Sequence, residues 1–148
     1  MTVIAWDGKT LAADRMMHTQ GYCVPYTKIR RIRGMLVGGA GNSAHVNEML
    51  YWLEAGCDPD KFPDFQRVQD EFVDILCITK DGQIHHYNRG PIPMRIEAKH
   101  FAIGSGAEVA QTAMHLGCTA AEAVSTAIEL APNNCGLGVD TLTLKQEE

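Results

Sequence analysis

The chain has 148 residues, of which 45% are hydrophobic and 21% are charged, and this size and composition predict one globular domain over residues 1–148. Thirteen Lys and Arg residues against eighteen Asp and Glu residues give a net charge of −5, so nucleic acid is not expected as a partner. The sequence has no apolar run of about 18 residues and no secretory leader pattern, so we expect no membrane span and a cytoplasmic location.

Strand-forming segments dominate the N-terminal part. Residues 2–6 and 10–13 flank an Asp-Gly-Lys turn and predict a hairpin. Further strands are expected at 27–32 and 35–39, on either side of an Arg-Gly turn.

One helix and one loop follow these strands. Apolar residues at helical spacing predict a helix over 44–55, with Ser43 as its N-cap and Gly56 after its last turn. Two prolines within 57–70 predict an irregular loop there.

The C-terminal half adds a second hairpin and two helices. The hairpin is expected from strands 73–79 and 83–87, and another short strand at 101–103. Each helix opens with a capping box, a hydroxyl followed three residues later by glutamate. The boxes are Ser105 with Glu108 and Thr119 with Glu122, and the helices should end near Leu116 and Leu130, before a last strand at 139–144. The order of elements predicts an α+β layered domain.

The cysteines and histidines do not suggest a metal site. Five cysteines are odd in number and form no C-x-x-C pair, so we expect reduced thiols rather than disulfides or zinc ligands. They are Cys23, Cys57, Cys77, Cys118 and Cys135. His85 and His86 adjoin in a predicted strand and therefore point to opposite faces. We expect neither a metal nor a cofactor.

The most informative residue for chemistry is Thr2. A small residue at position 2 is the kind from which the initiator methionine is usually removed, which would leave Thr2 with a free α-amine beside its hydroxyl. An amine with a reference pKa of about 7.7–8.0 can serve as the base that activates this hydroxyl. A threonine in a β-strand is also common without any catalytic role, so the remainder of the chain has to decide between the two interpretations.

Five sequence blocks occur in an order that resembles the proteasome β-subunits, and most closely the bacterial ATP-dependent protease HslV. The blocks are TVIA at 2–5, LAADR at 11–15, KIRR at 28–31, VGGAGNSA at 37–44 and AIGSG at 102–106. The resemblance covers essentially the whole chain. It implies the four-layer αββα sandwich of the N-terminal nucleophile hydrolases.

The resemblance also implies roles for individual residues. Thr2 aligns with the nucleophile, Lys28 with a buried lysine beside it, and Asp14 with the carboxylate that pairs with this lysine. Gly38 aligns with a glycine whose N–H contributes to the oxyanion hole, and Ser105 with a serine near the amine of the nucleophile. Each of these residues also has a structural interpretation, such as a surface ion pair, a turn glycine or a helix cap.

The same alignment implies a pocket for the substrate residue before the cleaved bond. Met17, Leu36 and Ala40 would line it, which predicts a preference for apolar or neutral side chains. The chain departs from the family at residues 133–136, where an Asp and a Ser or Thr would normally support the site. The spacings from Thr2 to Asp14 and from Asp14 to Lys28 are also shorter than usual.

The resulting hypothesis is a threonine-type endopeptidase subunit. The resemblance implies a homo-oligomeric ring that acts on polypeptides, with an ATP-driven unfoldase as a possible partner. Two alternatives remain open at this point: a non-catalytic ring subunit that keeps Met1, and a small-molecule amidohydrolase of the same superfamily.

Overall fold

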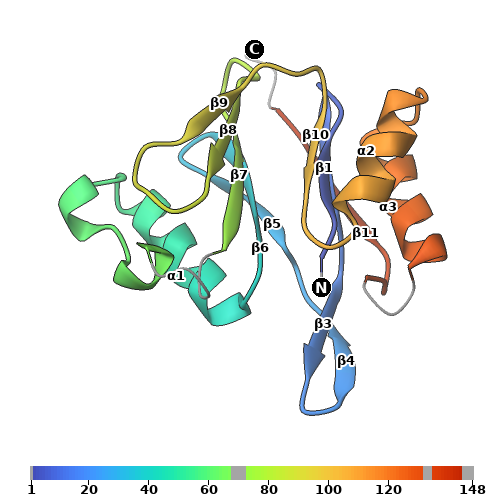
Figure 1. Cartoon of the computed structure of the whole chain (residues 1–148), viewed down its shortest axis with the longest axis horizontal. Helices are drawn as coiled ribbons and strands as arrows, with labels where there is room; N and C mark the ends of the chain where they lie inside the picture. The colour runs from blue at the N-terminus through green and yellow to red at the C-terminus, as the bar shows by residue number, and fades with distance from the viewer. Residues whose placement is uncertain (1, 68–72, 132–134, 145–148) are drawn as a thin grey trace.

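Two antiparallel β-sheets face each other in the computed structural model, which describes residues 2–67, 73–131 and 135–144 (Figure 1). The first sheet has the order β10 (Phe101–Ile103), β1 (Ile4–Trp6), β2 (Thr10–Asp14) and β11 (Val139–Thr143). The second has the order β5 (Ile29–Ile32), β6 (Met35–Ala40), β7 (Asp74–Ile78), β8 (Ile84–Tyr87) and β9 (Met94–Ile96). A separate hairpin of β3 (Met16–Thr19) and β4 (Tyr22–Pro25) projects from the end of the sheets (Figure 1).

Alternation along β1 divides its side chains between two cores. Ile4 and Trp6 point toward the second sheet, whereas Val3 and Ala5 lie in the cluster that includes the C-terminal helices. The core between the sheets contains Leu11, Leu36 and Leu76, all fully buried. Burial of one such side chain contributes about 1.5–3 kcal/mol to folding, so this contact holds the two sheets face to face.

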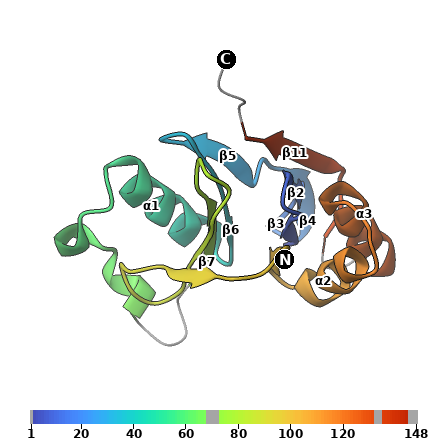
Figure 2. The same cartoon turned by 90° about the horizontal axis from the view of Figure 1, so that it is seen from above.

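Helices cover the outer faces of both sheets, as Figure 2 shows from above. α2 (Ala107–His115) and α3 (Ala120–Leu130) pack on the first sheet. Their buried faces consist largely of alanine, which allows the helix backbones to approach the sheet closely. These alanines are Ala110, Ala113, Ala120, Ala123 and Ala127.

α1 (Ser43–Glu54) covers the second sheet. Trp52 anchors it, with ring centroids 5.0 Å from Phe62 and 5.5 Å from Tyr87 in edge-to-face geometry. The indole N–H of Trp52 donates to the Asp58 carbonyl at 2.8 Å. This bond ties α1 to the segment after it, which forms the short 3₁₀ turns Pro59–Lys61 and Asp64–Arg67 within the predicted loop.

The structure confirms the α+β class and the predicted elements to within two residues at their ends. The sequence pattern does not predict β3, β4 or β9. The β3–β4 turn is made by Gln20 and Gly21, both with positive φ, which is the geometry of a two-residue hairpin turn. Gln-Gly is not one of the strong hairpin-turn pairs, and Pro25 is unusual in a strand, so the sequence pattern does not reveal this hairpin.

Two of the predicted helix caps are wrong. Asn42, rather than Ser43, caps α1, because its side-chain oxygen accepts from the N–H groups of Ala44 and His45 at 3.0 and 3.3 Å. α2 begins after Gly106 and has no side-chain cap, so Ser105 is not part of a capping box. The box at the start of α3 is confirmed, with both of its hydrogen bonds present.

The described residues also bear on membranes, metals and thiols. None of the described helices has the length and apolar character needed to cross a bilayer. Within residues 2–67, 73–131 and 135–144 no three His, Cys, Asp or Glu side chains gather as a metal-binding group. His86 instead pairs with Asp74 at 2.9 Å. All five cysteines are free thiols.

Candidate active site

Thr2 lies immediately before β1, where the first sheet ends beside β5 and β6, and it is 7% exposed. Its Oγ1 accepts a hydrogen bond from Lys28 Nζ at 3.1 Å, and its backbone N–H donates to Ser105 Oγ at 3.1 Å. Gly104 makes this position possible. It has φ +96°, and a Cβ there would lie 2.2 Å from the Thr2 carbonyl oxygen. The segment after β10 therefore packs directly against the Thr2 backbone and holds it in position.

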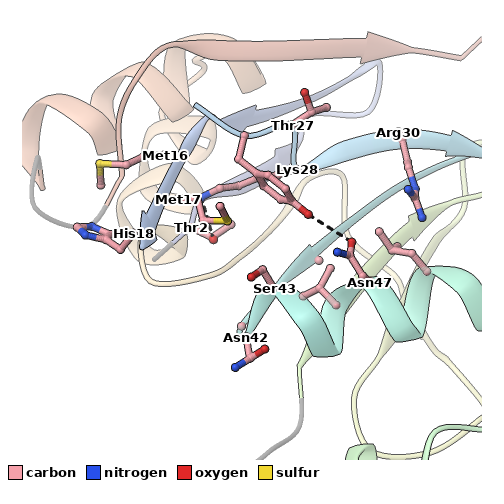
Figure 3. Close-up of a pocket in the computed structure, with 15 residues that line it drawn as sticks. Thr2, Met16, Met17, His18, Thr27, Lys28, Arg30, Asn42, Ser43 and Asn47 are labelled. Atoms are coloured by element: carbon pink, nitrogen blue, oxygen red, sulfur yellow. Dashed lines mark hydrogen bonds between the residues drawn. The ribbon is translucent and has the colours of Figure 1, made fainter. Parts of the chain in front are cut away.

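Lys28 and Asp14 form a buried ion pair beside Thr2. Lys28 Nζ lies 3.1 and 3.0 Å from the two carboxylate oxygens of Asp14, and the side chains are 6% and 0% exposed. Figure 3 shows Lys28 extending to Thr2. Because the Lys28 ammonium donates to Thr2 Oγ1 as well as to Asp14, one cation connects the carboxylate with the hydroxyl. A buried pair of this kind needs further hydrogen bonds to offset its desolvation.

Backbone amides provide those bonds to Asp14. Val3 N–H donates to Oδ1 at 3.0 Å, and the N–H groups of Met16 and Gly136 donate to Oδ2 at 3.2 and 3.3 Å. Three segments of the chain thus converge on one carboxylate. These neutral N–H groups stabilise the negative charge of Asp14 without competing with the Lys28 ammonium as a second cation.

Burial lowers the pKa of Lys28 below its ordinary value of 10.5, and the charge and hydrogen bonds of Asp14 oppose that shift. Asp14 therefore favours the charged form of Lys28 against the effect of burial. As an ammonium with little contact to water, Lys28 is a stronger hydrogen-bond donor toward Thr2 Oγ1 than a solvent-exposed lysine would be.

Ser105 lies on the other side of Thr2. Its Oγ accepts from Thr2 N–H and makes a longer contact of 3.4 Å with the Thr2 carbonyl oxygen. This contact explains why Ser105 does not cap α2: its hydroxyl is directed toward Thr2 instead. The structure thus brings Thr2, Asp14, Lys28 and Ser105 together.

Gly38 does not join this group. It lies in the middle of β6, in register with Ile29 on one side and Leu76 on the other, so its backbone groups belong to the sheet ladder. A Cβ on Gly38 would meet Ile29 and Ile4 at 2.9 Å, which places the residue in the core between the sheets. The predicted position of the oxyanion glycine is therefore corrected.

Gly41 lies three residues after Gly38, outside the sheet ladder. It follows the last residue of β6, has φ +132°, lines the cavity beside Thr2, and its N–H has no hydrogen-bond partner among the described residues. The run of glycines at 38–41 contains both candidates. Only the position at which β6 ends distinguishes Gly38, within the sheet ladder, from Gly41, just outside it.

A cavity of about 260 Å³ opens beside Thr2 between α1, β5, β6 and the β3–β4 hairpin (Figure 3). Residues from all these elements line it: Thr2, Met16, Met17, His18, Tyr26, Thr27, Lys28, Arg30, Gly39, Gly41, Asn42, Ser43, Val46, Asn47 and Leu50.

Of the three predicted pocket residues, only Met17 lines this cavity. Leu36 and Ala40 belong to the core between the sheets, 0% and 7% exposed, so their predicted place in the pocket is wrong. Because side chains alternate between the two faces of a strand, Leu36 and Ala40 both point to the inner face of β6, away from α1.

The polar residues of the cavity were not predicted from the sequence. Tyr26 O–H donates to Asn47 Oδ1 at 3.3 Å, and Arg30 lies two residues after Lys28. The spacing of Lys28 and Arg30 was a usable signal, because residues two apart in a strand share a face.

The loop that departs from the family is described in part. Residues 133 and 134 lie outside the described residues, whereas Cys135 is buried and Gly136 donates to Asp14. Burial raises the pKa of the Cys135 thiol, the charge of Asp14 adds to the increase, and Lys28 opposes it. The loop therefore supports the carboxylate through its backbone.

The fold is shared with a solved structure, Thiobacillus denitrificans BPH in complex with epoxomicin. The TM-score is 0.71 and the sequence identity is 18%, and the match covers 99% of this chain and 100% of that chain. No known protein family matches the chain, and no curated protein matches it either. At this identity the likeness establishes a common fold.

Proposed function

We propose that the chain is a threonine-type endopeptidase subunit with Thr2 as the nucleophile. The observation that carries this proposal is the Lys28 ammonium, which bonds both Thr2 Oγ1 and the buried Asp14. The neighbour's complex with epoxomicin supports a proteasome-like activity on the shared fold. In this proposal the two facing sheets with their outer helices are the four-layer αββα sandwich of the N-terminal nucleophile hydrolases, built from residues 1–148 as one domain.

The mechanism requires removal of Met1. The free amine of Thr2 then takes the proton of its own hydroxyl, and Oγ1 attacks the carbonyl carbon of a peptide bond. Lys28 stabilises the developing alkoxide charge, and Gly41 N–H donates to the oxyanion. The leaving amine departs with the proton, and a water then hydrolyses the acyl-enzyme, so that Thr2 is regenerated. The cavity takes the side chain of the substrate residue whose carbonyl is attacked.

Ring assembly and cytoplasmic location belong to the same proposal. A hydrolytic site that acts on many polypeptides is controlled best by limited access, and a homo-oligomeric ring supplied by an unfoldase would provide it. Sedimentation velocity should then give a mass several times that of the monomer, and a stable monomer with full activity would contradict the ring.

The test of the catalytic claim is Thr2→Ala, made in protein whose N-terminus has been verified by mass spectrometry. We expect turnover of fluorogenic peptides to fall at least about a thousandfold, since the nucleophile itself is removed. Thr112→Ala is the matched control, because Thr112 lies on the exposed face of α2 and donates only to the Glu108 carbonyl. Equal activity of wild type and Thr2→Ala would reject the proposal.

A further inference from the structure

Positive charge gathers at one end of the cavity beside Thr2. Arg30 lines that end, and Figure 3 shows it with Asn47 on one side of Thr2, away from Met16 and His18 on the other. Lys28 and Arg30 are two residues apart on extended backbone, so their Cα atoms are separated by about 6.6 Å. Arg30 and the Lys28 that bonds Thr2 Oγ1 therefore line the same cavity from one stretch of extended backbone.

Among the residues that the structure describes, none with an acidic side chain lines the cavity. The fifteen lining residues include Lys28, Arg30 and His18 but no Asp or Glu, although the whole chain carries a net charge of −5. Lys28 is neutralised by Asp14, whereas Arg30 forms no ion pair with any described residue. Within the described part of the chain, the Arg30 guanidinium is thus the cavity cation without a carboxylate partner.

The other polar groups at this end favour an anion as well. The positive end of α1 lies at the cavity through Ser43, and its first turn carries no acidic residue, whereas α2 and α3 have Glu108 and Glu122 there. Tyr26 and Asn47 add a hydroxyl and an amide beside Arg30. These groups can turn a donor toward a carboxylate, which an apolar side chain cannot use.

We propose that Arg30 selects substrates with glutamate or aspartate immediately before the cleaved bond, an inference that rests on the proposed peptidase function. The guanidinium can hold a carboxylate through two parallel hydrogen bonds. Met17 contacts the aliphatic part of the substrate's glutamate or aspartate side chain. The expected preference for apolar residues, which relied on Leu36 and Ala40, is thereby replaced by a preference for acidic ones.

Matched fluorogenic peptides with Glu, Gln, Leu or Lys before the cleaved bond test this selection. Wild type should cleave the Glu peptide with a kcat/KM about tenfold above the Gln and Leu peptides, since hydrogen bonds to a charged group are among the strong ones. Arg30→Leu should lose that preference, chiefly through KM, and retain turnover of the Leu peptide. Arg30→Glu should favour the Lys peptide.

Arg31→Leu is the matched control. Arg31 neighbours Arg30 on β5 but bonds the Thr143 carbonyl of β11, away from the cavity. The Arg31→Leu substitution removes one positive charge, as Arg30→Leu does, and should leave the peptide preference unchanged.

The outcomes separate this inference from the proposed function. Preference for the Leu peptide in wild type, or a Glu preference that survives in Arg30→Leu, would overturn the role of Arg30 while leaving the peptidase intact. Failure of wild type with a free Thr2 to cleave any of the four peptides would overturn the peptidase function and this inference together.

Discussion

The proposed reaction depends on the protonation states of two groups, the Thr2 amine and the Lys28 side chain. The proposed base, the Thr2 amine, must be unprotonated, and the Lys28 ammonium must keep its proton to stabilise the hydroxyl oxygen. The first condition sets in as pH rises through about 8, the reference range for an α-amine. The second ends as pH rises through the pKa of Lys28, which burial lowers below 10.5. The rate should therefore pass through a maximum between these two values.

The position of the alkaline limb tests the Lys28–Asp14 pair. Asp14→Asn removes the charge that opposes the effect of burial on the pKa of Lys28. The alkaline limb of kcat/KM should consequently move to lower pH, and activity at neutral pH should fall. Asp140→Asn is the control, because Asp140 pairs with Arg15 at 2.8 Å in a partly exposed site. An unchanged alkaline limb in Asp14→Asn would show that Lys28 does not titrate in that limb.

The same pair links pH to stability. Because the folded chain lowers the pKa of Lys28, the unfolded chain binds more protons between that lowered pKa and 10.5. The contribution of Lys28 to the free energy of unfolding therefore increases with pH across this window. Replacing Lys28 by Met should remove this increase, which urea unfolding at several alkaline pH values can measure.

Ser105 shows how a local signal can be overridden by a distant one. The pattern S-x-x-E predicts a capping box, and the same pattern at Thr119 forms one. At Ser105 the hydroxyl instead contacts Thr2, 103 residues away in the sequence. A capping motif is read from four residues, whereas the competing partner is known only once β1 and β10 are paired.

At the scale of elements, the start of α3 is held by two parts of the chain. Thr119 and Glu122 form the reciprocal box at 3.0 and 3.2 Å. Asp7, in the turn between β1 and β2, accepts from the N–H of Ala120 at 2.8 Å. The first hairpin thus satisfies a helix amide that its own box leaves open, which ties α3 to the sheet that carries Thr2.

Removing the box should cost stability without altering the chemistry. Thr119→Ala should lower the free energy of unfolding by about 1 kcal/mol, the usual value for a lost N-cap, while kcat stays close to that of wild type. Ser125→Ala, on the exposed face of α3, serves as the control for the change in side-chain size. A kcat that falls with the cap would mean that α3 positions the site more directly than its contacts indicate.

Elements that a local sequence pattern determines could be predicted. Features that depend on the exact residue at which a strand ends could not. Apolar periodicity predicted α1, the capping-box patterns predicted α2 and α3, and the ordered sequence blocks indicated Thr2, Asp14 and Lys28. Gly38 and Gly41 could not be distinguished, because a run of small residues contains no signal for the residue at which β6 leaves the ladder. The cavity was mispredicted for the same reason: the face of each β6 residue depends on the register with β5 and β7.

On the scale of the whole molecule, the contact between the sheets supports the site. Ile4, two residues after Thr2, packs directly over the bare backbone of Gly38 in the other sheet. The absence of a side chain at Gly38 sets how closely β1 and β6 approach, and through β1 it sets the position of Thr2 relative to Lys28. Close packing transmits a displacement at one sheet to the other.

Gly38→Ala tests this connection. Its Cβ would lie 2.9 Å from Ile4 Cδ1 and Ile29 Cγ2, so both side chains must shift within the core between the sheets, which should cost about 1–3 kcal/mol of stability. Because Ile4 moves with β1, kcat/KM should fall as well. Gly90→Ala is the control, since a Cβ there meets no atom within 4 Å. Alanine retains the backbone N–H, so a stable Gly38→Ala variant with full activity would show that Thr2 is positioned independently of the packing between the sheets.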